Sequence, residues 1–376
     1  MIKIAKNDLE AALKVVSSTV GSNGAEISGH YLFRYKAGVL TVLSFNNRTF
    51  SSCPVVCSSD VEGDVMFTSE AWRVQDLLNA VPAGTVLNFE PNGSEVVVSG
   101  ARGKLEFSSL NPSSFPFWDD LLAEAKETAR VPAHRLKRAF DHAAMFISND
   151  EQRVAFLCVA EFRNGLLYST DQIAVSTVKV PGMENSAIRV HEKNIAALRS
   201  FLDSAKETEI SVLEHDRSLF IVRADGATFG ESRFGSRFPD FDINWDLEDD
   251  HKWTVNKESF IGNVKFLRCA AVKNDVKLSI KAEGTGRLDM AMKSQSGKPN
   301  HVSLESAVLS SKNEALPLPE TGVDVSHRHL GLTMAVHGGD RVTLGVSKRD
   351  KGGWVRVRDE RDGNTYLTTI AWIKSA

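Results

Sequence analysis

Basic side chains recur at helical spacing between Val131 and Ile147. Apolar residues of this stretch fall on one helical face and form a continuous stripe, namely Leu136, Ala139, Phe140, Ala143 and Ile147. Basic residues occupy the other side, namely Arg135, Arg138 and His142 with His134 and Lys137 beside them, and within the helix only Asp141 opposes them. A row of cations can bind phosphate groups, although a single helix of this kind is more often an ordinary solvated surface helix.

Further predicted helices combine an apolar stripe with basic residues on another face. Arg328 lies with His327 and His329 on one of them. The helices before residue 122 are not basic on their own, because Lys14 and Arg73 are set against four acids, Asp8, Glu10, Glu70 and Asp76. For one residue, a solvated surface position explains the charge as well as phosphate contact does. For the set, we expect loose phosphate contacts without base recognition. The predicted nucleic-acid-binding residues are Arg73, Arg135, Lys137, Arg138, Lys193, Arg199, Lys257, Lys265 and Arg268.

No catalytic or metal-binding constellation is recognisable, and we expect neither a cofactor nor a bound metal. The paired carboxylates Asp119-Asp120 and Glu248-Asp249-Asp250 lie in polar runs that are typical of solvated loops. The phosphate-binding loop of nucleotide-driven enzymes does not occur in the sequence. The four cysteines lack paired metal-ligand spacing, so free buried thiols are expected.

Composition indicates a soluble globular protein of two or three domains. The chain has 376 residues, 42% of them hydrophobic and 25% charged, with a formal net charge of −3. Neither a signal peptide nor a membrane span is recognisable, so a cytoplasmic protein is expected.

The order of predicted helices and strands repeats three times along the chain. Gly103 and Gly226 each lie in the turn between two predicted strands and are 123 residues apart. Phe115 and Phe238 are separated by the same interval. This repeat predicts an α+β fold of three domains, 1–122, 123–247 and 248–376, each with two helices packed on antiparallel strands. The charged stretches Asp119–Thr128 and Asp246–His251 are the predicted linkers.

Several phrases of the sequence resemble one known family. They are Gly100-Ala-Arg-Gly-Lys-Leu-Glu-Phe-Ser-Ser-Leu110 followed by Phe115-Pro116, Tyr168-Ser-Thr-Asp171 followed by Ala174-Val175, and Arg237-Phe-Pro-Asp-Phe241. In order and spacing they are similar to the bacterial type of DNA polymerase sliding clamp, the β-subunit family. The resemblance covers essentially the whole chain.

The resemblance implies a ring of two protomers that encircles duplex DNA, with helices lining the hole. Such a ring is a non-catalytic processivity factor, with a clamp loader and a DNA polymerase as partners. Its two junctions would join Leu105 and Phe107 of one protomer to Ala271 and Val272 of the other. By matching positions, the groove for partner peptides would comprise Phe156, Thr170, Gln172, Ile173, Pro239, Ile243, Thr368, Ile370, Ala371 and Trp372.

The sequence departs from the family pattern in that groove. Gln172-Ile173 stand where the family has Gly-His-Arg-Leu, and the apolar-Pro-apolar tail is replaced by Ile370-Ala-Trp-Ile373. A divergent partner motif with bulky apolar anchors is therefore expected. Two other functions stay open from the sequence: a ring-shaped DNA-binding scaffold or regulator without a polymerase partner, and an enzyme whose site is scattered over the repeats.

Overall fold

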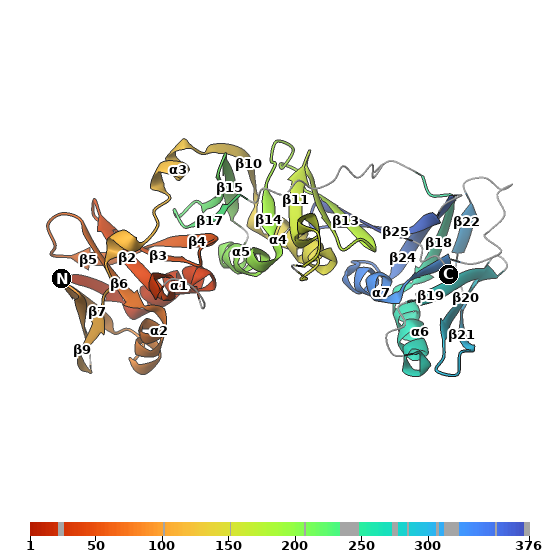
Figure 1. Cartoon of the computed structure of the whole chain (residues 1–376), viewed down its shortest axis with the longest axis horizontal. Coiled ribbons are helices and arrows are strands. Elements are labelled where there is room, and N and C mark those ends of the chain that lie inside the picture. Colours follow the sequence, from red (N-terminus) through yellow and green to blue (C-terminus); the bar gives the residue numbers. More distant parts are fainter. Residues whose placement is uncertain are drawn as a thin grey trace. The chain divides into compact units, whose positions relative to one another are not determined.

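The structure is a computed structural model, and the element order in it follows the predicted repeat. It describes residues 1–21, 26–100, 102–150, 152–206, 208–233, 248–272, 277–283, 286–305, 308–311, 323–349 and 352–371. In each repeat a strand leads into a helix, further strands follow, a second strand leads into a second helix, and three strands close the repeat (Figure 1).

The first repeat and the connector after it extend to Glu124. The elements are β1 (Ile2–Ala5), α1 (Lys6–Val16), the 3-10 turns η1 (Ser17–Thr19) and η2 (Glu26–Gly29), β2 (His30–Lys36), β3 (Val39–Phe45), β4 (Thr49–Val55), β5 (Cys57–Ser59), β6 (Val65–Glu70), α2 (Ala71–Ala80), β7 (Val86–Asn92), β8 (Glu95–Gly100), β9 (Gly103–Ser108), η3 (Pro112–Ser114) and α3 (Asp119–Glu124).

The second repeat follows directly. Its elements are β10 (Lys126–Pro132), α4 (Ala133–Ala143), η4 (Ala144–Phe146), η5 (Ala155–Cys158), β11 (Val159–Arg163), β12 (Leu166–Thr170), β13 (Ala174–Lys179), β14 (Arg189–His191), α5 (Glu192–Ala205), β15 (Glu209–His215), β16 (Ser218–Arg223) and β17 (Thr228–Ser232).

The third repeat begins at the predicted end of the second linker. Its elements are β18 (His251–Asn256), α6 (Lys257–Ala270), β19 (Lys277–Glu283), β20 (Arg287–Lys293), β21 (Pro299–Leu304), β22 (Val308–Ser311), β23 (Val323–Ser326), α7 (His327–Val336), β24 (Arg341–Arg349), β25 (Gly352–Arg361) and β26 (Asn364–Ala371).

Residue contacts divide the chain into two compact units. Unit 1 comprises Met1–Arg138 and Gly182–Gly235, and unit 2 comprises Ala139–Pro181 and Ser236–Ala376. The division follows the sheets, because in unit 1 β17 of the second repeat pairs with β4 of the first, and in unit 2 β13 pairs with β26 of the third. The boundaries 122/123 and 247/248 stay predictions.

Each unit is built on antiparallel sheets. In unit 1 one sheet has the order β5-β1-β7-β8-β9 and the other β10-β15-β16-β17-β4-β3-β2-β6. In unit 2 one sheet contains the run β11-β12-β13-β26-β25-β24-β18-β22, and the other has the order β21-β20-β19-β23. The strands β9 and β21 therefore each lie at a sheet edge. Helix α6 packs beside β20 and β21 (Figure 1).

The first predicted linker is ordered structure. Its residues form α3 and the start of β10, and Arg34 holds Asp119 through two hydrogen bonds of 2.6 and 3.0 Å. Just before α3, the ring of Trp118 stacks on Phe50 with 4.1 Å between centroids, and Phe115 is buried. Stacked aromatic rings anchor this connector over the sheet, which the short, charged sequence alone did not indicate. Of the second linker, residues 246 and 247 lie outside the described residues.

None of the described helices is long and apolar enough to span a membrane.

Candidate nucleic-acid interface and partner groove

Helix α4 buries its predicted apolar stripe and exposes one of its predicted basic residues. Leu136, Ala139, Phe140 and Ala143 are buried, and Arg138 is exposed. Arg135 and Lys137 are half-buried, and the Lys137 ammonium lies 3.7 Å from the Asp203 carboxylate of α5. The helix ends at Ala143, so Ile147 lies beyond it, and Phe146 rather than Ile147 is fully buried. Arg138 is therefore accessible on this face, and the charge of Lys137 is partly neutralised by Asp203 of α5.

Helix α5 carries the next two predicted cations. Ile195, Leu198 and Leu202 are buried, which leaves Lys193 exposed and Arg199 half-buried. In the same unit, Arg73 on α2 is exposed but forms an ion pair with Glu70. The Arg73 guanidinium also lies 4.5 Å from the ring of the exposed Trp72. The ion pair with Glu70 therefore reduces the net charge that Arg73 adds to its surface.

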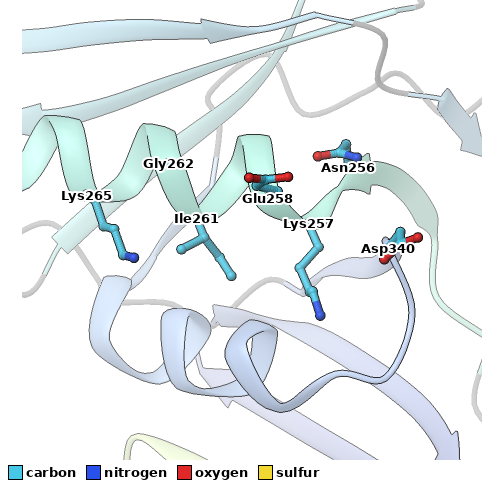
Figure 2. Close-up of a pocket in the computed structure, with 7 residues that line it drawn as sticks. All are labelled: Asn256, Lys257, Glu258, Ile261, Gly262, Lys265 and Asp340. Carbon is cyan, nitrogen blue, oxygen red and sulfur yellow. The ribbon is translucent and has the colours of Figure 1, made fainter.

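Helix α6 of unit 2 places three cations along one side. Lys257 and Lys265 line a groove of about 700 Å³ together with Ile261, as Figure 2 shows, and Arg268 is exposed one turn further on. Lys257 Nζ donates to the His337 carbonyl at the end of α7 over 2.9 Å. The C-terminal end of a helix carries partial negative charge, so this contact stabilises α7. Lys265 and Arg268 are the exposed cations of the stripe.

Three histidines assigned to the basic faces are not there. His142, His327 and His329 are 4%, 9% and 3% exposed, so predicting them on solvated faces was wrong. His142 Nε2 lies 3.2 Å from the Thr368 hydroxyl. Burial, together with the nearby charge of Arg361, lowers the pKa of His142 to about 3, so its ring is neutral. Arg328, between the other two on α7, is exposed.

The turn between β12 and β13 forms the exposed part of the predicted groove. Gln172 is exposed and Ile173 is 38% exposed, with the Ile173 carbonyl accepting from the Ala371 amide over 3.0 Å. Phe156 is half-buried, and its neighbour Val154, which the sequence did not single out, is 57% exposed. We call Val154, Phe156, Gln172, Ile173 and Ala371 the turn surface.

Other residues of the predicted groove are buried in the sheet. Thr170 and Thr368 are 1% exposed and Ile370 is 0% exposed. The prediction that these side chains line an open groove is therefore not met in the structure. Thr170 lies in the sheet beside β13 through its pairing with Val175, and Thr368 and Ile370 lie on β26, which pairs with the other edge of β13. Thr170 supports the turn, because its hydroxyl accepts from the Gln172 amide and donates to the Ala174 carbonyl. Pro239, Ile243 and Trp372 lie outside the described residues.

The predicted junction residues lie on the edge strand β9 and directly after α6. On β9 Leu105 is 51% exposed, whereas Phe107 is 7% exposed. Leu105 borders a hollow of about 140 Å³ that Leu77, Ala80, Val81, Leu87 and Val98 also line. After α6, Ala271 is half-buried and Val272 is 37% exposed. The sequence missed Phe266, 68% exposed, whose position off the Phe260–Val264 stripe could have identified it.

Solved structures with the same architecture cover the whole chain. The DNA polymerase III subunit beta of Pseudomonas aeruginosa superposes with a TM-score of 0.82 at 15% identity, covering 100% of both chains. The DNA polymerase sliding clamp of Caulobacter crescentus gives 0.82 at 17% identity, covering 100% of this chain and 99% of that one. The chain has the bacterial sliding-clamp fold. The beta subunit of Thermotoga maritima agrees, with a TM-score of 0.81 at 14% identity over 100% of both chains.

Sequence similarity to clamps is weaker than the structural similarity. The beta sliding clamp of Proteus mirabilis is 23% identical over 187 residues, which are 46% of this chain and 48% of that protein, so the match spans about half the length of this relative. No protein-family model matches the chain. The clamp fold inferred from three repeats and a few short phrases is therefore confirmed, on a sequence that has diverged widely.

Proposed function

We propose that this chain is a DNA sliding clamp, a processivity factor that closes into a ring around duplex DNA and tethers a polymerase. The observation that carries the proposal is the clamp fold, which matches clamp structures over the full length of both chains. The clamp relatives are named as polymerase subunits, and a clamp makes and breaks no bond itself. A non-catalytic role follows, with a loader needed to open the ring.

The exposed cations support nonspecific binding of duplex DNA. Arg138 and Lys193 in unit 1 and Lys265 and Arg268 in unit 2 are exposed on helices whose opposite faces are buried. Charges on long, solvated side chains attract phosphates without reading bases. A ring that must slide requires such contacts, because a base-specific contact would stop it at one sequence.

Ring closure would join the β9 edge of one protomer to the β21 edge of another. An exposed strand edge readily pairs with another strand, and each unit has such an edge. Leu105 and the adjoining apolar hollow lie at one edge, and Phe266 and Val272 are exposed on and just after α6, the helix that packs beside β21. Burying each large apolar side chain contributes about 1.5–3 kcal/mol. Two head-to-tail contacts of this kind would close a homodimer.

The turn surface is the proposed docking site for partner peptides. Val154, Phe156 and Ile173 are apolar and accessible, and Gln172 supplies an amide beside them. A short peptide with bulky hydrophobic anchors matches this composition. The polymerase and the loader would both use it, as alternative occupants of one site.

One experiment tests ring and function together. The protein is loaded with a clamp loader onto nicked circular DNA and onto the same DNA after linearisation, and its mass in solution is measured by light scattering. A clamp has the mass of a dimer, stays on the circle and leaves the linear form. Equal retention on both forms, or retention that depends on one DNA sequence, would reject the clamp and favour a DNA-binding regulator.

A further inference from the structure

The Asp171 carboxylate holds the β12–β13 turn together with Thr170 Oγ1, which accepts from the Gln172 amide and donates to the Ala174 carbonyl. Asp171 Oδ1 accepts hydrogen bonds from the backbone amides of Ile173 and Ala174, each at a distance of 3.1 Å. Gln172, which lies between Asp171 and Ile173, has a φ of 80°, in the left-handed region that residues other than glycine rarely adopt. Such a backbone persists only where its surroundings hold it. Asp171 therefore fixes the turn that exposes Ile173.

A buried histidine from α7 holds this carboxylate in place. His329 Nε2 lies 2.6 Å from Asp171 Oδ2, and His329 Nδ1 lies 2.6 Å from the Ser326 hydroxyl. Ser326 is also the N-cap residue of α7, where its side chain accepts from the His329 amide. Both ring nitrogens of His329 are therefore engaged, and the ring has a single orientation.

The charge state of Asp171 is consistent with this contact. Burial acts to raise the pKa of Asp171, but the hydrogen bonds from His329 and from the turn amides outweigh it and hold the pKa below its usual value. A carboxylate that stays ionised accepts stronger hydrogen bonds than a neutral group does. The pair thus fixes the turn more firmly than the amide contacts alone.

The same turn is connected to the other elements of the turn surface. The Asp171 carbonyl accepts from Arg153 Nη1 over 3.2 Å, next to Val154, and the Ile173 carbonyl accepts from the Ala371 amide. A shift of Asp171 would thus move the three segments that carry Val154, Ile173 and Ala371 relative to one another. All of these residues belong to unit 2.

We propose that Asp171 and His329 form a latch that positions the turn surface for its partner peptide. Both are positioning residues, since their hydrogen bonds determine how Ile173 is presented. The latch rests on the proposed docking of partners at the turn surface. It adds that α7, a helix outside the predicted groove, sets the affinity of that site.

The test compares His329→Leu with His329→Gln. Leucine fills the buried space without a hydrogen bond, whereas glutamine can still donate to Asp171. The control is His327→Leu, because His327 is also buried but lies about 200° around the same helix. Hydrogen–deuterium exchange reports the turn amides directly. Fluorescence anisotropy reports binding of a labelled hexapeptide with leucine at its third position, phenylalanine at its sixth and alanine or serine elsewhere.

The expected result is local. In His329→Leu, the amides of residues 172–174 should exchange faster and the hexapeptide should bind about tenfold more weakly, as for loss of one charge-assisted hydrogen bond. His329→Gln should recover most of both effects, and His327→Leu should resemble the parent. Unchanged exchange at the turn in His329→Leu would overturn the latch. So would equal loss of peptide binding in His327→Leu.

Failure of the proposed function would look different. If the parent protein does not bind the hexapeptide and stimulates no polymerase, docking at the turn surface is wrong, while the exchange measurement still decides whether His329 holds the turn. If the parent binds and His329→Leu binds equally well despite faster exchange at the turn, the latch does not position the binding surface and the inference is rejected.

Discussion

The basic helix faces and the turn surface differ in how many residues determine each of them. On α6 the cations Lys265 and Arg268 extend separately into solvent, and each adds one charge. On the turn surface, Ile173 is presented by a backbone that Asp171 and His329 hold through buried hydrogen bonds. A binding surface made of independent charges should lose affinity in steps, whereas one made of a fixed turn should fail after a single change.

The largest effect is expected for Ile173→Asp. A carboxylate placed at an apolar contact must lose its hydration when a peptide anchor binds, which costs several kcal/mol. Polymerase stimulation should be abolished, with the dimer mass and DNA retention unchanged. Val86→Asp is the control, since Val86 is 50% exposed and belongs to unit 1, whereas the turn belongs to unit 2. Full stimulation by Ile173→Asp would place the docking site elsewhere.

The next effect concerns a buried carboxyl group near α5. Glu231 accepts from Asn194 Nδ2 over 2.8 Å, and burial raises the pKa of Glu231 to about 7. The folded state therefore prefers the protonated form, so stability present at low pH is lost as pH rises from about 4.5 through 7. At pH 8 the cost is on the order of 3 kcal/mol. Urea unfolding of Glu231→Gln should show a flatter pH dependence above pH 5. A slope equal to that of the parent would contradict this assignment.

The buried His142, which lies beside Thr368 of β26, should give a dependence of the opposite sign. Because burial and Arg361 lower the pKa of His142 to about 3, the unfolded chain binds a proton below about pH 6.5 that the folded chain excludes. The free energy of unfolding should therefore decrease as the pH is lowered, and at pH 5 it should be about 2 kcal/mol smaller than at neutral pH. His142→Gln, which keeps a partner for Thr368, should remove this loss in urea unfolding. If the variant is as acid-sensitive as the parent, His142 titrates normally.

The difference between local patterns and contacts of distant residues also explains which features could be predicted from the sequence. The stripes Leu136–Ala143 on α4 and Ile195–Leu202 on α5 are local periodicities, and the structure buries them as expected. Thr368 and Ile370 are buried on β26, which pairs with β13 nearly 200 residues earlier in the chain, and no local pattern reveals that pairing. Arg328 and His329 look alike as basic residues of one helix, yet only His329 meets Asp171, 158 residues away.

A moderate effect is expected when two charges of α4 are reversed. Each phosphate contact contributes roughly 0.9 to the slope of log affinity against log salt concentration, so Arg135→Glu with Arg138→Glu should reduce the slope by about 1.8. The loss should be equal on DNA of different sequences. Lys36→Glu with Lys126→Glu, at exposed strand positions, changes the net charge equally and is the control. Unequal loss between sequences would indicate base recognition and contradict sliding.

The smallest effects should separate two lysines of one helix face. Lys257 donates to the His337 carbonyl at the end of α7. Lys265 lines the same groove about two turns further along α6 and is exposed (Figure 2). Lys257→Met should lower the free energy of unfolding by about 1 kcal/mol, because the helix end loses a cation. Lys265→Met should leave stability within about 0.5 kcal/mol of the parent and reduce the salt slope by roughly 0.9. If instead both variants keep the parent's stability and reduce the slope equally, Lys257 is a phosphate contact of the same kind as Lys265, and the whole face of α6 consists of independent charges.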